Sequence, residues 1–173
     1  MQKRSWTRLA ALAVLAPGSA HAAAPPSLCQ PQEQVIFACS VKPSKKLVSL
    51  CARQLGSPAA SLQYRFGRPG HIELQHPQQA AGSLQAFRHG SYGRYRVERQ
   101  SVSFENLGVR YTVFDDHEGD MQPEVHERGV RVSQGERELA TLHCTGPVRS
   151  ELHRLREHLA CDDTQALSCP AKP

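Results

Sequence analysis

Residues 91–114 read SYGRYRVERQSVSFENLGVRYTVF. Apolar and polar side chains alternate through this stretch, and a turn-forming Asn-Leu-Gly triplet interrupts the alternation. If the chain doubles back after its first segment, the alternation predicts that Val97 faces Val102. In the same register Tyr95 faces Phe104, so we expect both rings on the buried face of an antiparallel meander.

Runs with the same period of two recur along most of the chain, and glycine and proline residues with turn propensity separate them. The ten expected strands, all within residues 34–145, are residues 34–40, 46–52, 61–66, 71–75, 83–88, 91–98, 101–105, 109–114, 129–133 and 138–144. This rhythm predicts a mainly β fold, a compact antiparallel barrel or sandwich of about ten short strands.

The period of the apolar residues changes after the last of these runs. Leu152, Leu155 and Leu159 fall at helical spacing, and Ser150 is a typical N-cap residue. We therefore predict one amphipathic helix over residues 150–160, which packs its leucine side chains against the sheet.

The first 22 residues have the parts of a bacterial-type export signal. Lys3, Arg4 and Arg8 form a basic leader, residues 9–16 are apolar, and small residues follow as cleavage requires. The apolar stretch is far shorter than the roughly 20 residues that span a bilayer. We expect a signal peptide at residues 1–22, no membrane anchor, and a single periplasmic or secreted domain at residues 23–173.

The charge of the chain gives little support to nucleic-acid binding. Three of the 21 basic residues lie in the leader, so 18 remain against 16 acidic residues, and the formal charge falls from +5 to +2. The remaining basic residues are scattered rather than gathered in one run. We expect no nucleic acid among the partners.

All six cysteines lie after the expected cleavage site, and an even number in an exported chain indicates three disulfides. Local spacing favours one bridge across a first hairpin, one that pins the helix to the last strand, and one between the two ends of the domain. These pairs are Cys39–Cys51, Cys144–Cys161 and Cys29–Cys169. The alternative joins Cys39 to Cys144, the first strand to the last, in a closed sheet.

Residues 115–120 read DDHEGD, and their four carboxylates and one histidine could ligate a hard cation. Their spacing does not match the Asp-x-Asp-x-Asp-Gly calcium loop, and this favours an acidic turn between strands. His117 and His126 lack a partner at the spacing of a known zinc motif, while His153 and His158 are five residues apart. We expect neither a metal nor another cofactor.

Catalytic motifs are absent from the sequence. It contains no Gly-x-Ser-x-Gly elbow and no glycine-rich phosphate loop, and we expect every cysteine to be oxidised. The sequence therefore predicts that the protein is not an enzyme. A hydrolase or a metal-dependent enzyme that uses residues 115–120 remains an alternative, because catalytic triads assemble in space rather than in sequence.

Aromatic and arginine residues alternate between residues 87 and 96, and these residue types most often anchor protein interfaces. Tyr92 lies between Gly90 and Gly93, where the backbone can bend sharply, so we expect its ring to be exposed. The predicted binding residues are Phe87, Arg88, Tyr92, Arg94 and Arg96.

Four segments resemble a group of exported bacterial proteins of uncharacterised function. They are FACSV at 37–41, KLVSLC at 46–51, LQYRFGRPG at 62–70 and YTVFDD at 111–116. The chain also resembles the small β-barrel lysozyme inhibitors of bacterial envelopes. The shared features are a strand that ends in Cys, a Lys-rich turn after it, and a final strand that ends in Cys. Those inhibitors carry a Ser-Gly-x-x-Tyr type loop, from which residues 91–95 depart. The first resemblance implies no function, and the second implies an inhibitor.

Taken together, these features predict an exported, non-enzymatic binding module whose partner is an envelope protein or glycan. An envelope inhibitor is its most specific form. Besides the enzyme already considered, a structural envelope protein is a further alternative.

Overall fold

The structure is a computed structural model in which residues 25–164 are described. The expected signal peptide at residues 1–22 and the cysteine at position 169 lie outside this range. Between residues 25 and 164, no helix has the length and apolar character needed to cross a membrane.

Ten strands within the described residues form one sheet, and every neighbouring pair is antiparallel except β10 with β5. The strands are β1 (Gln34–Val41), β2 (Lys46–Arg53), β3 (Ser61–Arg68), β4 (His71–His76), β5 (Phe87–Arg94), β6 (Val97–Asn106), β7 (Val109–Glu118), β8 (Val125–Gln134), β9 (Arg137–Ser150) and β10 (Ala160–Cys161). Their order across the sheet is β10-β5-β6-β7-β8-β9-β1-β2-β3-β4. The predicted mainly β, antiparallel fold is confirmed.

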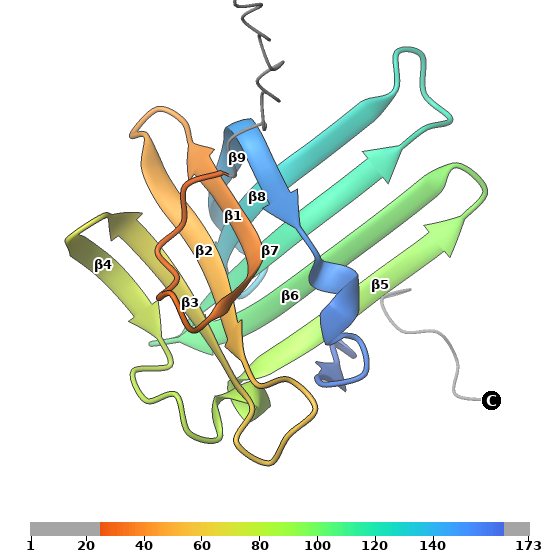
Figure 1. The fold of residues 1–173 in the computed structure, drawn as a ribbon. Coiled ribbons are helices and arrows are strands. Elements are labelled where there is room, and N and C mark those ends of the chain that lie inside the picture. The colour runs from red at the N-terminus through yellow and green to blue at the C-terminus, as the bar shows by residue number, and fades with distance from the viewer. Residues whose placement is uncertain (1–24, 165–173) are drawn as a thin grey trace, which may run out of the picture.

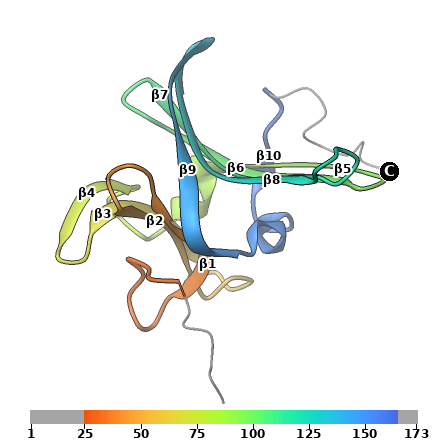
Figure 2. The same ribbon diagram turned by 90° about the horizontal axis from the view of Figure 1, so that it is seen from above.

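The sheet curls into a half-barrel with two layers, β1–β4 and β5–β8 (Figures 1 and 2). The long strand β9 is the corner between them, because residues 137–143 pair with β8 and residues 144–150 pair with β1. Gly146 lies in the second half of this strand with a φ of 71°, a conformation that favours glycine. One strand can therefore serve both layers.

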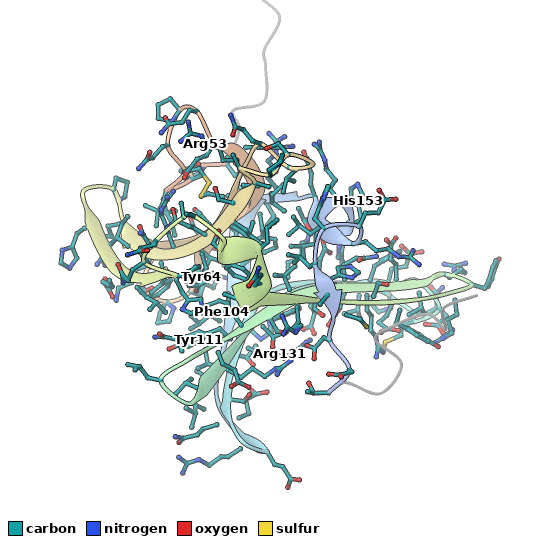
Figure 3. All side chains as sticks on the ribbon, turned by 90° about the horizontal axis from the view of Figure 1, so that it is seen from below. Arg53, Tyr64, Phe104, Tyr111, Arg131 and His153 are labelled. Atoms are coloured by element: carbon teal, nitrogen blue, oxygen red, sulfur yellow. A yellow bond between two sulfur atoms is a disulfide. The ribbon has the colours of Figure 1, made fainter. Side chains whose placement is uncertain are left out.

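The core lies between the two layers on the concave face of the sheet. The ring of Tyr64 from β3 lies 4.9 Å from Phe104 of β6 and 6.3 Å from Tyr111 of β7, measured between centroids. Figure 3 shows these three side chains together. Phe87 meets Phe104 edge to face at 5.5 Å. Aromatic rings from four strands thus hold the layers together.

The hairpin between β5 and β6 has a different register from the predicted one. Its turn falls at residues 95–96, where Arg96 has a φ of 59°, and Arg94 pairs with Val97. Val102 then faces His89, and Phe104 faces Phe87. The prediction of a buried Tyr95 is wrong, since that side chain is 86% exposed. The alternation of apolar and polar residues is compatible with the predicted turn and with the observed turn at residues 95–96. The observed turn buries Phe87 instead of Tyr95.

The boundaries of two other predicted strands also change. Ser83–Ala86 forms the short 3-10 turn η1, and β5 begins only at Phe87. At the other end of the meander, β7 continues to Glu118, so most of the acidic stretch is strand and not a turn. The antiparallel meander itself is confirmed.

The predicted helix over residues 150–160 is wrong. Strand β9 extends to Ser150, which pairs with β1, and only the 3-10 turn η2 (Leu152–Leu155) follows. Leu152 and Leu155 are buried. Their spacing therefore arises because both side chains of a short turn contact the core. Too few residues remain before β10 for a helix of several turns to form.

The predicted disulfide set is wrong, and the alternative pair is confirmed. Cys39 bonds to Cys144, and Cys29 bonds to Cys51. In the register of β1 with β2, Cys39 lies opposite Val48, so it does not face Cys51. Cys161 is also disulfide-bonded. Disulfides of this kind indicate an oxidising compartment.

Candidate functional site

The far ends of β5–β8 reach beyond the core and form an arm (Figure 2). Its tip consists of two turns, residues 94–97 and 118–125, which close the hairpins β5–β6 and β7–β8. The amide of Gly119 donates a hydrogen bond of 2.7 Å to the carbonyl of Arg96, so the two turns lie side by side. We call these two segments the arm tip.

Ion pairs connect the two turns of the arm tip. The Arg94 guanidinium lies 2.7 Å from Asp120, and that of Arg96 lies 2.7 Å from Glu124. The hydrogen bond from Arg94 lowers the pKa of the Asp120 carboxyl below its ordinary value. Exposed pairs of this kind add little stability. They do restrict the side chains, and each arginine neutralises a carboxylate of the other turn.

Two large apolar side chains remain exposed between these charges. Tyr95 is 86% exposed and Met121 is 51% exposed, one in each turn of the arm tip. Sequence reasoning assigned Tyr95 to the core and did not select Met121. The signal that identifies Tyr95 is the position of the turn, which depends on the pairing of β5 with β6.

The predicted binding residues fall on different parts of β5 and its turn. Phe87 is buried on the concave face, so it cannot meet a partner, whereas Arg88 is exposed on the other face. Arg88 donates to the carbonyls of Gln85 and Phe87, each at 2.9 Å. The structure brings Arg94 and Arg96 together at the arm tip. Alternation along the strand separates Phe87 from its arginine neighbours.

The predicted exposure of the Tyr92 ring is not what the structure shows. Strand β5 remains regular through Gly90 and Gly93, and the Tyr92 side chain is half-buried on the convex face. The guanidinium of Arg99 lies over its ring at 5.9 Å from the centroid. Tyr92 therefore borders the arm tip rather than forming its centre.

The acidic stretch does not converge on one point. Asp115 and Asp116 point to opposite faces of β7, and each meets a cationic or imidazole partner. Asp115 lies 2.6 Å from His126, Asp116 lies 2.5 Å from Arg131, and Glu118 pairs with Arg99. The four carboxylates of this stretch therefore do not form one calcium-type loop.

A buried carboxylate joins the C-terminal segment to the convex face. Asp162 accepts a hydrogen bond of 2.7 Å from Ser103 and pairs with Arg110. Burial alone would raise the pKa of the Asp162 carboxyl, but hydrogen bonds from Ser103, Thr164 and Arg110 hold the pKa below its ordinary value. The carboxylate is thus stabilised in its ionised form.

Asp162→Asn should make the free energy of unfolding depend less on pH in the acidic range. A carboxyl whose pKa is lowered by folding contributes stability above its unfolded pKa of about 3.9 and loses that stability as the pH falls through the folded value. We expect the variant to be less stable at pH 7 and to lose less between pH 5 and pH 2, as followed by urea unfolding. Asp163→Asn, at the exposed neighbouring residue, is the control and should have the stability of the parent at pH 7.

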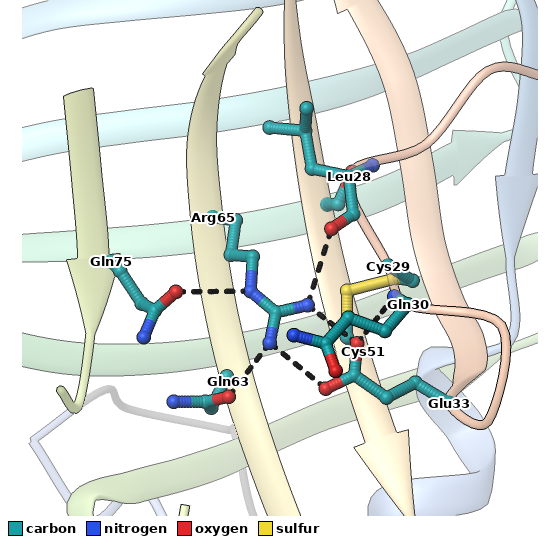
Figure 4. Close-up of a disulfide and its surroundings, with 9 residues drawn as sticks. Leu28, Cys29, Gln30, Glu33, Cys51, Gln63, Arg65 and Gln75 are labelled. Carbon is teal, nitrogen blue, oxygen red and sulfur yellow. Dashed lines mark hydrogen bonds and ion pairs between the residues drawn. A yellow bond between two sulfur atoms is a disulfide. The ribbon is translucent and has the colours of Figure 1, made fainter. Parts of the chain in front are cut away.

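A groove of about 570 Å³ is lined by residues of β3 and of the segment before β1, and Arg65 is one of them. All five N–H groups of this buried guanidinium are used (Figure 4). Two donate to Glu33 at 2.5 and 2.8 Å, and the others donate to Gln63, Gln75 and the carbonyl of Leu28. Arg65 has no donor left for a ligand, so its role is structural.

Glu33 also lies beside two cysteines. The sulfur atoms of these cysteines and a carboxylate oxygen of Glu33 all lie within 4.8 Å of one another, as the ligands of a metal ion would. The cysteines are Cys29 and Cys51, which are joined in a disulfide and so offer no thiolate to a metal. The disulfide and Arg65 together attach the segment before β1 to the sheet.

Comparison of the chain with protein-family models, with curated proteins and with solved structures found no match.

Proposed function

We propose that the protein is an exported, non-enzymatic binding module of the periplasm or the surrounding medium, and that it inserts its arm tip into a cleft of an envelope protein. The observation that carries this proposal is the 86% exposure of Tyr95 at the end of a projecting arm. An envelope inhibitor, which blocks a partner's cleft, is the most specific form of the proposal.

The composition of the arm tip supports a protein partner. Tyrosine, methionine and arginine are enriched in protein interfaces, and tyrosine and arginine dominate the residues with the largest binding energies. A convex tip with an exposed ring fits a concave site on the partner. The ion pairs of Arg94 and Arg96 restrain the two turns before binding, which reduces the ordering cost of association.

The charge of the arm tip also bears on recognition. Because Arg94 and Arg96 are neutralised by Asp120 and Glu124, the tip provides little long-range steering. We expect affinity to come from the apolar area of Tyr95 and Met121 and to depend only weakly on salt.

Tyr95→Ala should weaken partner binding and leave the fold intact. The ring contacts solvent, so its removal creates no cavity in the core. Affinity capture from periplasmic extract would identify the partner, and calorimetry with that purified partner should then show a loss of about 1 to 3 kcal/mol in binding free energy.

Leu107→Ala is the matched control for this experiment. Leu107 is 94% exposed, and it lies in the β6–β7 turn at the other end of the same strands. The Leu107→Ala variant should bind the partner with the same affinity as the parent protein. Equal affinities of the parent and Tyr95→Ala, or a captured glycan in place of a protein, would contradict the proposal.

A further inference from the structure

We propose that the concave face of the arm holds a divalent transition-metal site of the zinc type, with His117, His126 and the Asp115 carboxylate as ligands. None of these three ligands belongs to the arm tip, although Glu124 of the arm tip lies 3.5 Å from His117. It was not predicted from the sequence, because the two histidines lie on different strands.

The register of β7 and β8 brings the three side chains to one face. His117 pairs directly with His126, and the centroids of their rings are 5.2 Å apart. Asp115 precedes His117 by two residues, so both point to the same side of β7 as the core residue Val113. The Asp115 Oδ1 atom already lies 2.6 Å from Nε2 of His126. The three side chains thus share one face of the sheet. Their ligand atoms do not yet all lie within 4.8 Å of one another, so binding one ion requires side-chain rotation but no change of backbone.

These side chains line a cavity of about 280 Å³ between the arm and η2. Glu98 on β6, which faces His117, and His153 on η2 line the same cavity. A metal held by three protein ligands would therefore have a further imidazole or carboxylate, or water, available for its fourth position.

Gly119 helps to seat the His117 ring. A Cβ atom at residue 119 would lie 3.1 Å from Cε1 of His117 and 2.8 Å from the carbonyl oxygen of Arg96. The missing side chain lets the turn pack closely against the imidazole.

Metal binding requires a local exchange of partners. Nε2 of His126 now faces Asp115, while Arg128 lies 3.2 Å from Nδ1 of the same ring. When Nε2 binds the metal, the ring proton moves to Nδ1, and Arg128 turns toward Asp115, from which it is 4.0 Å away. His117 likewise exchanges Glu124, at 3.5 Å, for the metal. The carboxylates of Glu98, Asp115 and Glu124 offset the positive charge that enters.

The donor set determines the kind of ion. Imidazole nitrogen suits zinc and its transition-metal neighbours, whereas calcium and magnesium prefer six or more oxygen ligands. Two histidines and one carboxylate with an open fourth position therefore favour zinc over the hard cations.

Calorimetric titration of the purified protein with zinc tests the assignment. We expect one zinc ion per chain, a dissociation constant of roughly micromolar or below, and no comparable binding of calcium. His117→Gln and His126→Gln should each weaken binding by at least about tenfold. His71→Gln, at an exposed histidine of β4, should bind zinc like the parent.

Histidine-ring NMR of the parent provides a readout that does not depend on how a variant folds. Zinc should shift the ring signals of His117 and His126 and leave that of His71 unchanged. Unshifted signals of the pair, no zinc binding in the micromolar range, or an equal loss of affinity in His71→Gln would overturn the assignment.

Discussion

Replacement of both Cys39 and Cys144 by alanine is expected to lower the free energy of unfolding by about 4 to 5 kcal/mol. This bridge spans 105 residues and joins β1 to β9 at the corner of the half-barrel. In the chain-entropy treatment, a loop of roughly that length restricts the unfolded chain by about 4.7 kcal/mol. Urea unfolding of the parent and the double variant measures the difference.

The second bridge serves as the internal control. Cys29 and Cys51 are separated by only 22 residues, so their replacement by alanine should cost about 3.4 kcal/mol by the same treatment. An equal or larger loss at this pair would show that contacts of the sulfur atoms outweigh chain entropy. A parent whose unfolding is indifferent to reductant would contradict the stabilising role of both bridges.

Arg65→Met is expected to cost about 3 to 5 kcal/mol of stability, because it leaves a buried carboxylate without its partner. The side chains of Arg65 and Glu33 are only 3% and 10% exposed. Burial alone would raise the pKa of the Glu33 carboxyl, but hydrogen bonds from Arg65 and from the backbone of Gln30 lower it. The stability lost in Arg65→Met should therefore be greatest at neutral pH and decrease below the unfolded pKa of about 4.3.

A second substitution separates the buried charge from packing. Glu33→Gln in the Arg65→Met background removes the unpaired charge and should recover part of the lost stability. Arg68→Met on the same strand, at a side chain that is 55% exposed, should change stability by less than about 0.5 kcal/mol. If Arg65→Met and Arg68→Met unfold at the same urea concentration, the buried pair does not stabilise the fold.

Much of the fold could be predicted because strand formation leaves a local signal. The runs that begin at residues 34, 46, 61 and 71 start where β1–β4 start, since alternation and turn residues act over a few positions. The hairpin register was wrong because two turns satisfied the alternation. The apolar spacing of Leu152 and Leu155 was likewise ambiguous, since a buried 3-10 turn and a helix both require it.

The candidate site was only partly visible in the sequence. Arg94 and Arg96 were selected by residue type, and they do lie at the arm tip. Tyr95 was missed because its exposure depends on where the β5–β6 turn falls. His117 and His126 belong to no local zinc motif, because these histidines meet only across a strand pair.

The sequence by itself determined the class of fold and the presence of disulfides, because period-two alternation and cysteine count do not depend on how distant segments meet. Only the tertiary structure decided which cysteines pair, which side of the meander is buried, and which polar groups share a cavity. Cys39 meets Cys144 because β9 turns the corner of the sheet, and β1 pairs with its second half. Such contacts join segments about a hundred residues apart, and no local pattern encodes them.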